Sequence, residues 1–190
     1  VPLMAVGFIM SMSKKGRIRD VSEFVVGFSL LFLGLSFMKN SVPDLQSSPE
    51  ALAFLQSWSG RGLLSVLLFV LVGATLTLIL QSSSATVART LIFLNMGWIE
   101  FDMAAAMVLG ENIGTTITAN IAAAVGNTNA KRAALAHTVF NVFGVIWAVA
   151  LFHPFGSLIH WIIDVLGLSG SDQAPLYGIS MLHTVFNLIN

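Results

Sequence analysis

An apolar segment without a single charged residue, residues 62–80, constrains the fold most strongly. A helix of this length matches the hydrocarbon core of a bilayer, which takes about 20 apolar residues to cross. The rest of the chain agrees, because 56% of its residues are hydrophobic and only 9% are charged. Soluble domains average about 25% charged residues. The sequence therefore predicts an all-α, polytopic membrane protein in a lipid bilayer.

Charge and cysteine content exclude several other classes of protein. The formal net charge is +0, so no basic surface is left over for nucleic acid. The chain has no cysteine, which excludes a disulfide framework, a thiolate metal site and a cysteine nucleophile. It also has no glycosylation sequon. We expect a multi-pass protein of the cell membrane, in a bacterial inner membrane.

Two basic segments set the expected orientation. Lys14, Lys15, Arg17 and Arg19 lie close together after a short apolar stretch, and Lys131 begins a second basic pair with its neighbour. Basic loops favour the cytoplasmic side of a membrane. Both segments are therefore predicted to be cytoplasmic, with an even number of crossings between them.

The apolar segment 62–80 ends abruptly in the polar sequence 81–86, Gln-Ser-Ser-Ser-Ala-Thr. The apolar segment that follows, residues 87–99, would extend only about 20 Å as a helix. This is too short for a hydrocarbon core of roughly 30 Å. We therefore predict a re-entrant helical hairpin whose polar tip lies inside the membrane.

A second polar segment, residues 110–116 (Gly-Glu-Asn-Ile-Gly-Thr-Thr), interrupts the apolar stretch 103–126. Two glycines, an amide and an acid at this depth predict a discontinuous transmembrane helix. Interrupted helices persist in hydrocarbon only where the backbone is buried or lines a cavity. Two interruptions therefore predict one shared cavity, the arrangement by which transporters bind anions and cations.

The first interruption suits an anion. Ser82, Ser83, Ser84 and Thr86 offer neutral hydroxyl groups, and the next helix begins there with free amides and a positive dipole end. Gln81 can donate to an anion or present its carbonyl to a cation. The alternative is that these hydroxyls donate to carbonyls of their own helix.

The second interruption suits a cation. Asn112, Thr115 and Thr116 offer neutral oxygens, which a hard monovalent cation such as sodium accepts. The alternative is a kink caused by the two glycines. We predict a sodium ion near four residues: Gln81, Ser83, Asn112 and Thr115.

Three further residues have two open interpretations each. Glu111 is an acid deep in a span, where it either binds a cation or pairs with Arg89 or a helix terminus. Arg89 either biases the cavity toward anions or extends to the membrane surface. Asn141 is the last residue of the pentapeptide His-Thr-Val-Phe-Asn at 137–141, which recurs at 183–187 and places His, Phe and Asn on one face of each helix. Shared packing of repeated helices is the alternative there.

Enzyme motifs are missing from the sequence. The serines have no partner His and acid at a recognisable spacing, and there is no GxSxG, HExxH or GxxxxGK[ST] motif. We expect neither an enzyme nor a cofactor other than a coupling ion.

Three segments together resemble the type II sodium–phosphate cotransporter family. They are residues 75–86 (TLTLILQSSSAT), 107–119 (MVLGENIGTTITA) and 137–144 (HTVFNVFG). The similarity covers roughly residues 21–150, including 30–38 (LLFLGLSFM). The family fold has two inverted repeats, each with a QSSS segment, and binds phosphate and sodium between them. Only one QSSS is present here, so the resemblance implies one half of an inverted-repeat transporter, whose second repeat is a missing partner.

The resemblance also implies a division of the chain and a function. Residues 1–20 would be a truncated span and cytoplasmic basic loop, 21–152 the transporter repeat, and 153–190 an interfacial segment and truncated final helix. The implied function is sodium-coupled symport of inorganic phosphate by alternating access. Two alternatives stay open: sodium-coupled transport of another small anion, and a non-transporting membrane sensor or scaffold in phosphate signalling.

Overall fold

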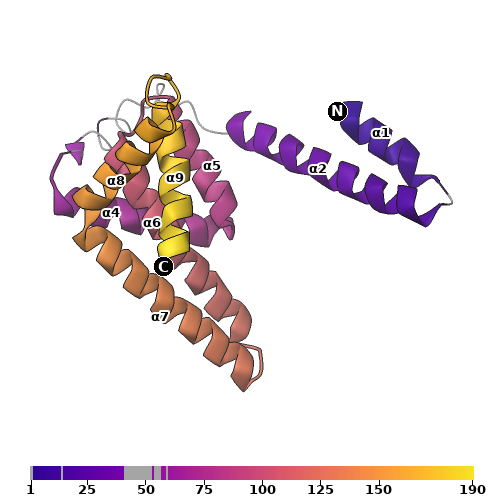
Figure 1. The fold of residues 1–190 in the computed structure, drawn as a ribbon. Coiled ribbons are helices and arrows are strands. Elements are labelled where there is room, and N and C mark those ends of the chain that lie inside the picture. The colour runs from indigo at the N-terminus through magenta and orange to yellow at the C-terminus, as the bar shows by residue number, and fades with distance from the viewer. Residues whose placement is uncertain (1, 14, 41–52, 54–56, 59) are drawn as a thin grey trace. The chain divides into compact units, whose positions relative to one another are not determined.

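The computed structural model describes residues 2–13, 15–40, 53, 57, 58 and 60–190. These residues form helices and turns and no strand, which confirms the all-α class. The helices are α1 (Pro2–Ser11), α2 (Gly16–Asn40), α4 (Leu63–Leu80), α5 (Ser83–Asn95), α6 (Phe101–Ala123), α7 (Thr128–Ala150), α8 (Phe152–Val165) and α9 (Ala174–Ile189) (Figure 1). The chain divides into two compact units, Val1–Pro43 and Asp44–Asn190. The domain boundaries expected from the sequence stay predictions.

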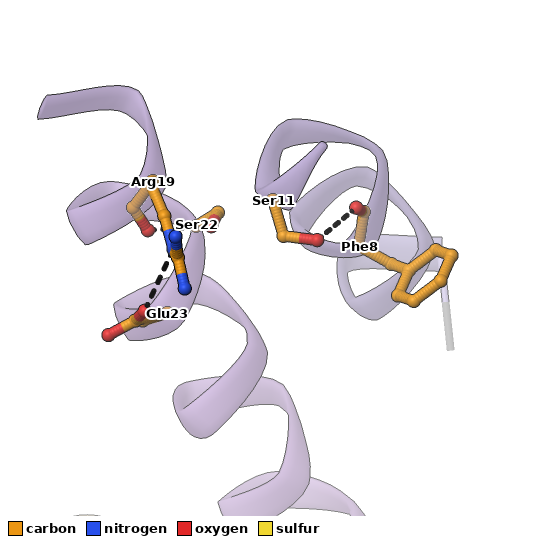
Figure 2. A network of polar contacts seen from close by, with 5 residues as sticks. All are labelled: Phe8, Ser11, Arg19, Ser22 and Glu23. Carbon is orange, nitrogen blue, oxygen red and sulfur yellow. Dashed lines mark hydrogen bonds and ion pairs between the residues drawn. The ribbon is translucent and has the colours of Figure 1, made fainter. Parts of the chain in front are cut away.

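The first unit consists of α1 packed against α2. Within it, the Ser11 hydroxyl donates to the carbonyl of Phe8 at 2.6 Å, and Arg19 forms an ion pair with Glu23 at 3.6 Å (Figure 2). That ion pair is exposed and contributes little to stability. Of the basic segment, Arg17 and Arg19 lie in the first turn of α2 and Lys15 directly precedes the helix, while Lys14 lies outside the described residues.

α6 is the central helix of the second unit. Its residues 103–111 are all buried, and Ala104, Val108 and Leu109 have no exposed surface. A helix that is apolar and covered on every side lies in the interior of its unit. α4, α5, α7 and α9 all pack against it.

The interruption expected within α6 is wrong, because α6 is one continuous helix from Phe101 to Ala123. Its glycines lie against α4 instead. A Cβ atom on Gly110 would collide with the carbonyl of Val70, and one on Gly114 with the carbonyl of Ala74. Small residues allow two helix backbones to approach closely in a membrane. The glycines therefore permit close helix packing, not a kink.

The interruption at residues 81–86 is confirmed as a break between α4 and α5. Gln81 ends α4 in the left-handed conformation, with φ 51°, and Ser82 is extended. The Ser82 hydroxyl accepts a hydrogen bond from the amide of Ala85 at 3.2 Å, which caps the N-terminus of α5. The chain therefore leaves one helix and starts the next within two residues.

Two helices in the described part of the chain are long and apolar enough to cross a membrane, namely α4 and α7. The C-terminal half of α6 and the N-terminal half of α7 run side by side and project beyond the rest of this unit (Figure 1). Asn120 of α6 donates to the hydroxyl of Thr138 of α7 and so joins the two helices.

The last two helices of the second unit are α8 and α9. α8 is amphipathic, because Phe152, Phe155, Ile159 and Ile163 are buried on one face at three- and four-residue spacing. α9 begins at Ala174 with a proline in its first turn.

Candidate functional site

The start of α5 contributes one side chain to a cavity, and two others form hydrogen bonds within the protein. Ser82 caps the helix. Thr86 is fully buried: its hydroxyl accepts a hydrogen bond from Thr77 of α4 at 3.1 Å and donates to the carbonyl of Ser82 at 3.0 Å. Gln81 and Ser84 are exposed. Ser83 is the residue of this segment that reaches the cavity.

The polar residues of α6 bond to carbonyls of their own helix. Asn112 donates to Val108 at 3.1 Å, and Thr115 donates to Glu111 at 2.9 Å. Thr116 donates to a carbonyl three residues earlier and has no exposed surface. The free carbonyls expected at an interruption are absent along this continuous helix, so the side-chain oxygens are the groups that α6 can offer a ligand.

A cavity of about 430 Å³ lies between α5, α6, α7 and α9. We call it the polar cavity. It is lined by Ser83, Asn112, Thr115, His137, Phe140, Asn141, His183, Asn187 and Asn190. These side chains include hydroxyls, amides and imidazoles, and no carboxylate, lysine or arginine is among them. The cavity therefore offers hydrogen-bond donors and neutral oxygens.

Four of the residues predicted from the sequence meet in this cavity: Ser83, Asn112, Thr115 and Asn141. Three of the four residues placed around the sodium ion are among them, and Gln81 is not. The predicted residues that do not line the cavity are Gln81, Ser82, Ser84, Thr86, Arg89, Glu111 and Thr116. Their roles in binding stay predictions.

Glu111 lies away from this cavity, in the interface between α5 and α6. The Thr90 hydroxyl donates to its Oε1 atom at 3.2 Å, while Oε2 is buried and has no hydrogen-bond partner among the described residues. The Nε atom of Arg89 is likewise buried and unpartnered. The ion pair left open between Glu111 and Arg89 does not form within the described ranges, where Arg19 and Glu23 form the one ion pair.

Five lining residues were missed by the sequence analysis: His137, Phe140, His183, Asn187 and Asn190. Four of them, all except Asn190, belong to the two copies of the repeated pentapeptide. Its first and last residues line the polar cavity in both copies, one copy on α7 and the other on α9. Two segments 46 positions apart in the sequence therefore meet around one cavity.

Comparison with known proteins gives a consistent result. A family model described as Na+/Pi-cotransporter matches residues 50–168. The chain is 32% identical to the uncharacterized protein YqeW of Bacillus subtilis, over 98% of this chain and 57% of that protein. It is 26% identical to the putative inorganic phosphate export protein YjbB of Escherichia coli, over 98% of this chain and 32% of that protein.

An animal relative is also similar. The sodium-dependent phosphate transport protein 2C of Homo sapiens is 36% identical over 63% of this chain and 23% of its own length. The chain thus spans no more than 57% of the length of these relatives. No solved structure matches it.

The family match covers more than half of the chain, and the relative in Bacillus subtilis matches almost all of it. The matched family is one of transporters and not of enzymes. The family match and the two helices that are apolar enough to cross a membrane together indicate a helical membrane protein. The chain belongs to the Na+/Pi-cotransporter family.

Proposed function

We propose that the protein containing this chain carries inorganic phosphate across the membrane by sodium-coupled symport, through alternating access. The observation that carries the proposal is the polar cavity, where Ser83, Asn112 and Thr115 meet between largely apolar helices. A cavity of about 430 Å³ has room for a small hydrated anion together with a sodium ion. The family and the printed names of two relatives support phosphate as the anion.

The phosphate group would bind at the start of α5. Ser83 is the first residue of that helix, where free backbone amides and the helix dipole favour a negative charge. The hydroxyl of Ser83 adds a neutral donor. Neutral donors suit transport, because the anion must leave again on the other side. The sodium ion would bind to the oxygens of Asn112 and Thr115.

We further propose that α4 and α5 form a re-entrant hairpin in a bacterial inner membrane. α5 has 13 residues and extends only about 20 Å, which is too short to cross a bilayer. The chain would supply one half of an inverted-repeat transporter, since it has one QSSS segment and spans only part of its relatives. The second repeat would then complete the binding site.

The coupling can be tested with purified protein in proteoliposomes. Uptake of radiolabelled phosphate should rise when an inward sodium gradient replaces a potassium gradient. Phosphate should raise the affinity for sodium by the same factor by which sodium raises the affinity for phosphate. Phosphate uptake that does not depend on the sodium gradient would overturn the proposed coupling of phosphate to sodium. Loading the vesicles with phosphate tests the opposite direction, which the name of the bacterial relative YjbB suggests.

The same vesicles distinguish the two alternative functions. Competition by sulfate or a small carboxylate at equal concentration would indicate a transporter of another anion. Phosphate binding without net flux would indicate a sensor or scaffold. Ser83→Ala should abolish uptake while the protein still inserts in the membrane, and wild-type uptake in this variant would remove Ser83 from the site.

A further inference from the structure

α8 has two exposed faces besides its buried one. Leu158, Trp161 and Val165 lie at three- and four-residue spacing and form an exposed apolar stripe, in which Trp161 is 61% and Val165 65% exposed. Next to this stripe, His160 and Asp164 lie four residues apart on an exposed polar face. α8 directly follows α7, one of the two helices apolar enough to cross a membrane. A helix with these faces at the end of a span is suited to the boundary between acyl chains and lipid headgroups.

A cavity of about 480 Å³ lies where the apolar stripe and the polar face of α8 meet. We call it the α8 pocket. Its walls come from the start of α6, the second half of α8, the turn after α8 and the start of α9, and they include Phe101, Trp161 and Asp164. The α8 pocket shares no lining residue with the polar cavity, so it is separate from the proposed phosphate and sodium site.

Contacts among the described residues hold the walls of the α8 pocket in place. The rings of Phe101 and His160 have their centroids 4.7 Å apart. Phe101 also lies against Gly178 of α9, where a Cβ atom would come within 2.8 Å of the phenyl ring. The Ser169 hydroxyl donates to Oδ1 of Asp164 at 2.8 Å, so the turn after α8 orients this carboxylate. The pocket is therefore formed without a ligand.

The α8 pocket is electronegative. Asp164 is the one carboxylate among the described residues that line it, and no lysine or arginine is among them. Asp164 forms no ion pair with any described residue. It lies in the last turn of α8, where the helix dipole is also negative and favours a cation. The carboxylate and the dipole together attract a positively charged ligand.

The aromatic side chains beside the carboxylate narrow the choice of cation. The face of an aromatic ring attracts an ammonium group, and both Phe101 and Trp161 line the pocket. A metal ion is a poorer fit, because no group of three His, Cys, Asp or Glu side chains in the described part of the chain could hold one. Oδ2 of Asp164 receives no hydrogen bond from a described residue, so it can accept one from a primary ammonium group.

We propose that the α8 pocket binds the primary ammonium group of a phosphatidylethanolamine headgroup, with Asp164 as its counter-ion and Trp161 beside it. The acyl chains would lie along the exposed apolar stripe, which continues from Trp161 to its neighbours on α8. The bound lipid would hold α8 and the start of α9 at the membrane surface. This site goes beyond the proposed transport function and does not depend on it.

Calorimetric titration of the purified protein in detergent with short-chain lipids provides the test. Dihexanoyl-phosphatidylethanolamine should bind about tenfold more tightly than dihexanoyl-phosphatidylglycerol, which has the same chains but no ammonium group. The phosphatidylglycerol titration also controls for partition of lipid into micelles. Dihexanoyl-phosphatidylcholine should bind more weakly than the ethanolamine lipid, because its quaternary ammonium group cannot donate a hydrogen bond to Asp164.

Three variants test the residues. Asp164→Asn keeps an acceptor oxygen for Ser169 but removes the charge, so it should weaken binding of the ethanolamine lipid about tenfold. Trp161→Leu keeps an apolar side chain on the exposed stripe but removes the aromatic face, and it should also weaken binding. Asp172→Asn is the matched control, because it removes an exposed carboxylate from the same turn region outside the pocket. The control should keep the wild-type affinity, and all three variants should keep the wild-type unfolding temperature.

Several results would overturn the proposal. They are wild-type affinity for the ethanolamine lipid in Asp164→Asn, and equal affinity of the wild type for the three lipids. Free ethanolamine that binds as tightly as the short-chain lipid would overturn it too, because the occupant would then be a soluble amine. Phosphate uptake in proteoliposomes is measured separately, so a protein that moves no phosphate could still bind the lipid through Asp164.

Discussion

The Thr90 hydroxyl of α5 donates to the Glu111 carboxylate of α6 at 3.2 Å, and both residues are almost completely buried. One turn earlier on α5, Thr86 accepts from Thr77 of α4. These two hydrogen bonds lie along one side of α5 and join it to α4 and α6. They fix the position of the α5 N-terminus, and with it the position of Ser83 in the polar cavity.

Thr90→Val should therefore destabilise the protein. The substitution keeps the shape of the side chain but leaves a buried carboxylate oxygen without its donor, at a cost of about 1–3 kcal/mol in the free energy of unfolding. Thermal unfolding in detergent measures the change. Thr90→Ser keeps the hydroxyl and should lie closer to the wild type. Equal stability of the valine variant and the wild type would show that the hydrogen bond is dispensable.

The glycines of α6 should not tolerate a side chain. Gly110→Ala would push a methyl group into the backbone of α4 at Val70, and overpacking of this kind costs about 1–3 kcal/mol or more. A lower unfolding temperature and aggregation on size-exclusion chromatography are the expected results.

Gly156→Ala is the matched control for that substitution. Gly156 also lies in a helix, α8, but a Cβ atom there has no neighbour within 4 Å. Alanine has the higher helix propensity by about 1 kcal/mol, so this variant should be as stable as the wild type or more stable. Tolerance of alanine at both glycines would mean that α4 and α6 do not need their close approach.

The pattern of apolar and polar segments predicted α4 and the break that follows it. The charge-free segment 62–80 corresponds to α4, and the Gln-Ser-Ser-Ser segment marked the break after Leu80. The Gly-Glu-Asn-Ile-Gly segment was misjudged, because a glycine has two structural uses in a membrane helix. It can break the helix or admit a neighbouring backbone, and only the position of α4 shows which use applies at Gly110.

Only part of the candidate site could be predicted, because some of its residues come together only in the tertiary fold. Ser83, Asn112 and Thr115 belong to polar segments that interrupt apolar stretches, and such interruptions indicate a binding site. His183 and Asn187 lie on α9, which contacts α5 and α6 only through the tertiary fold. The repeated pentapeptide was visible in the sequence, but its two possible uses, packing and binding, differ only in where the helix faces point.

At Gln81, the role of the left-handed backbone conformation can be tested separately from the role of the side-chain amide. It is the non-glycine residue with positive φ among the described residues, and this left-handed conformation costs most residues about 1–2 kcal/mol. Gln81→Gly should keep the break and the stability, while Gln81→Val should lower the unfolding temperature. Phosphate uptake should fall in both variants, since each lacks the amide. Wild-type uptake by the glycine variant would show that Gln81 serves only to end α4.

Ser82 and Ser83 are neighbours with different roles, so a pair of alanine substitutions should separate stability from transport. Ser82→Ala removes the cap of α5 and should cost about 1 kcal/mol of stability, which Ser82→Thr should largely restore because threonine also caps helices. Ser83→Ala removes a hydroxyl that lines the polar cavity and does not cap α5, so the unfolding temperature should stay unchanged while phosphate uptake is lost. Unfolding temperature and uptake measured on the same preparations test both roles. Loss of stability in Ser83→Ala with normal uptake would reverse the two assignments, because the hydroxyl would then hold the helix and not the anion.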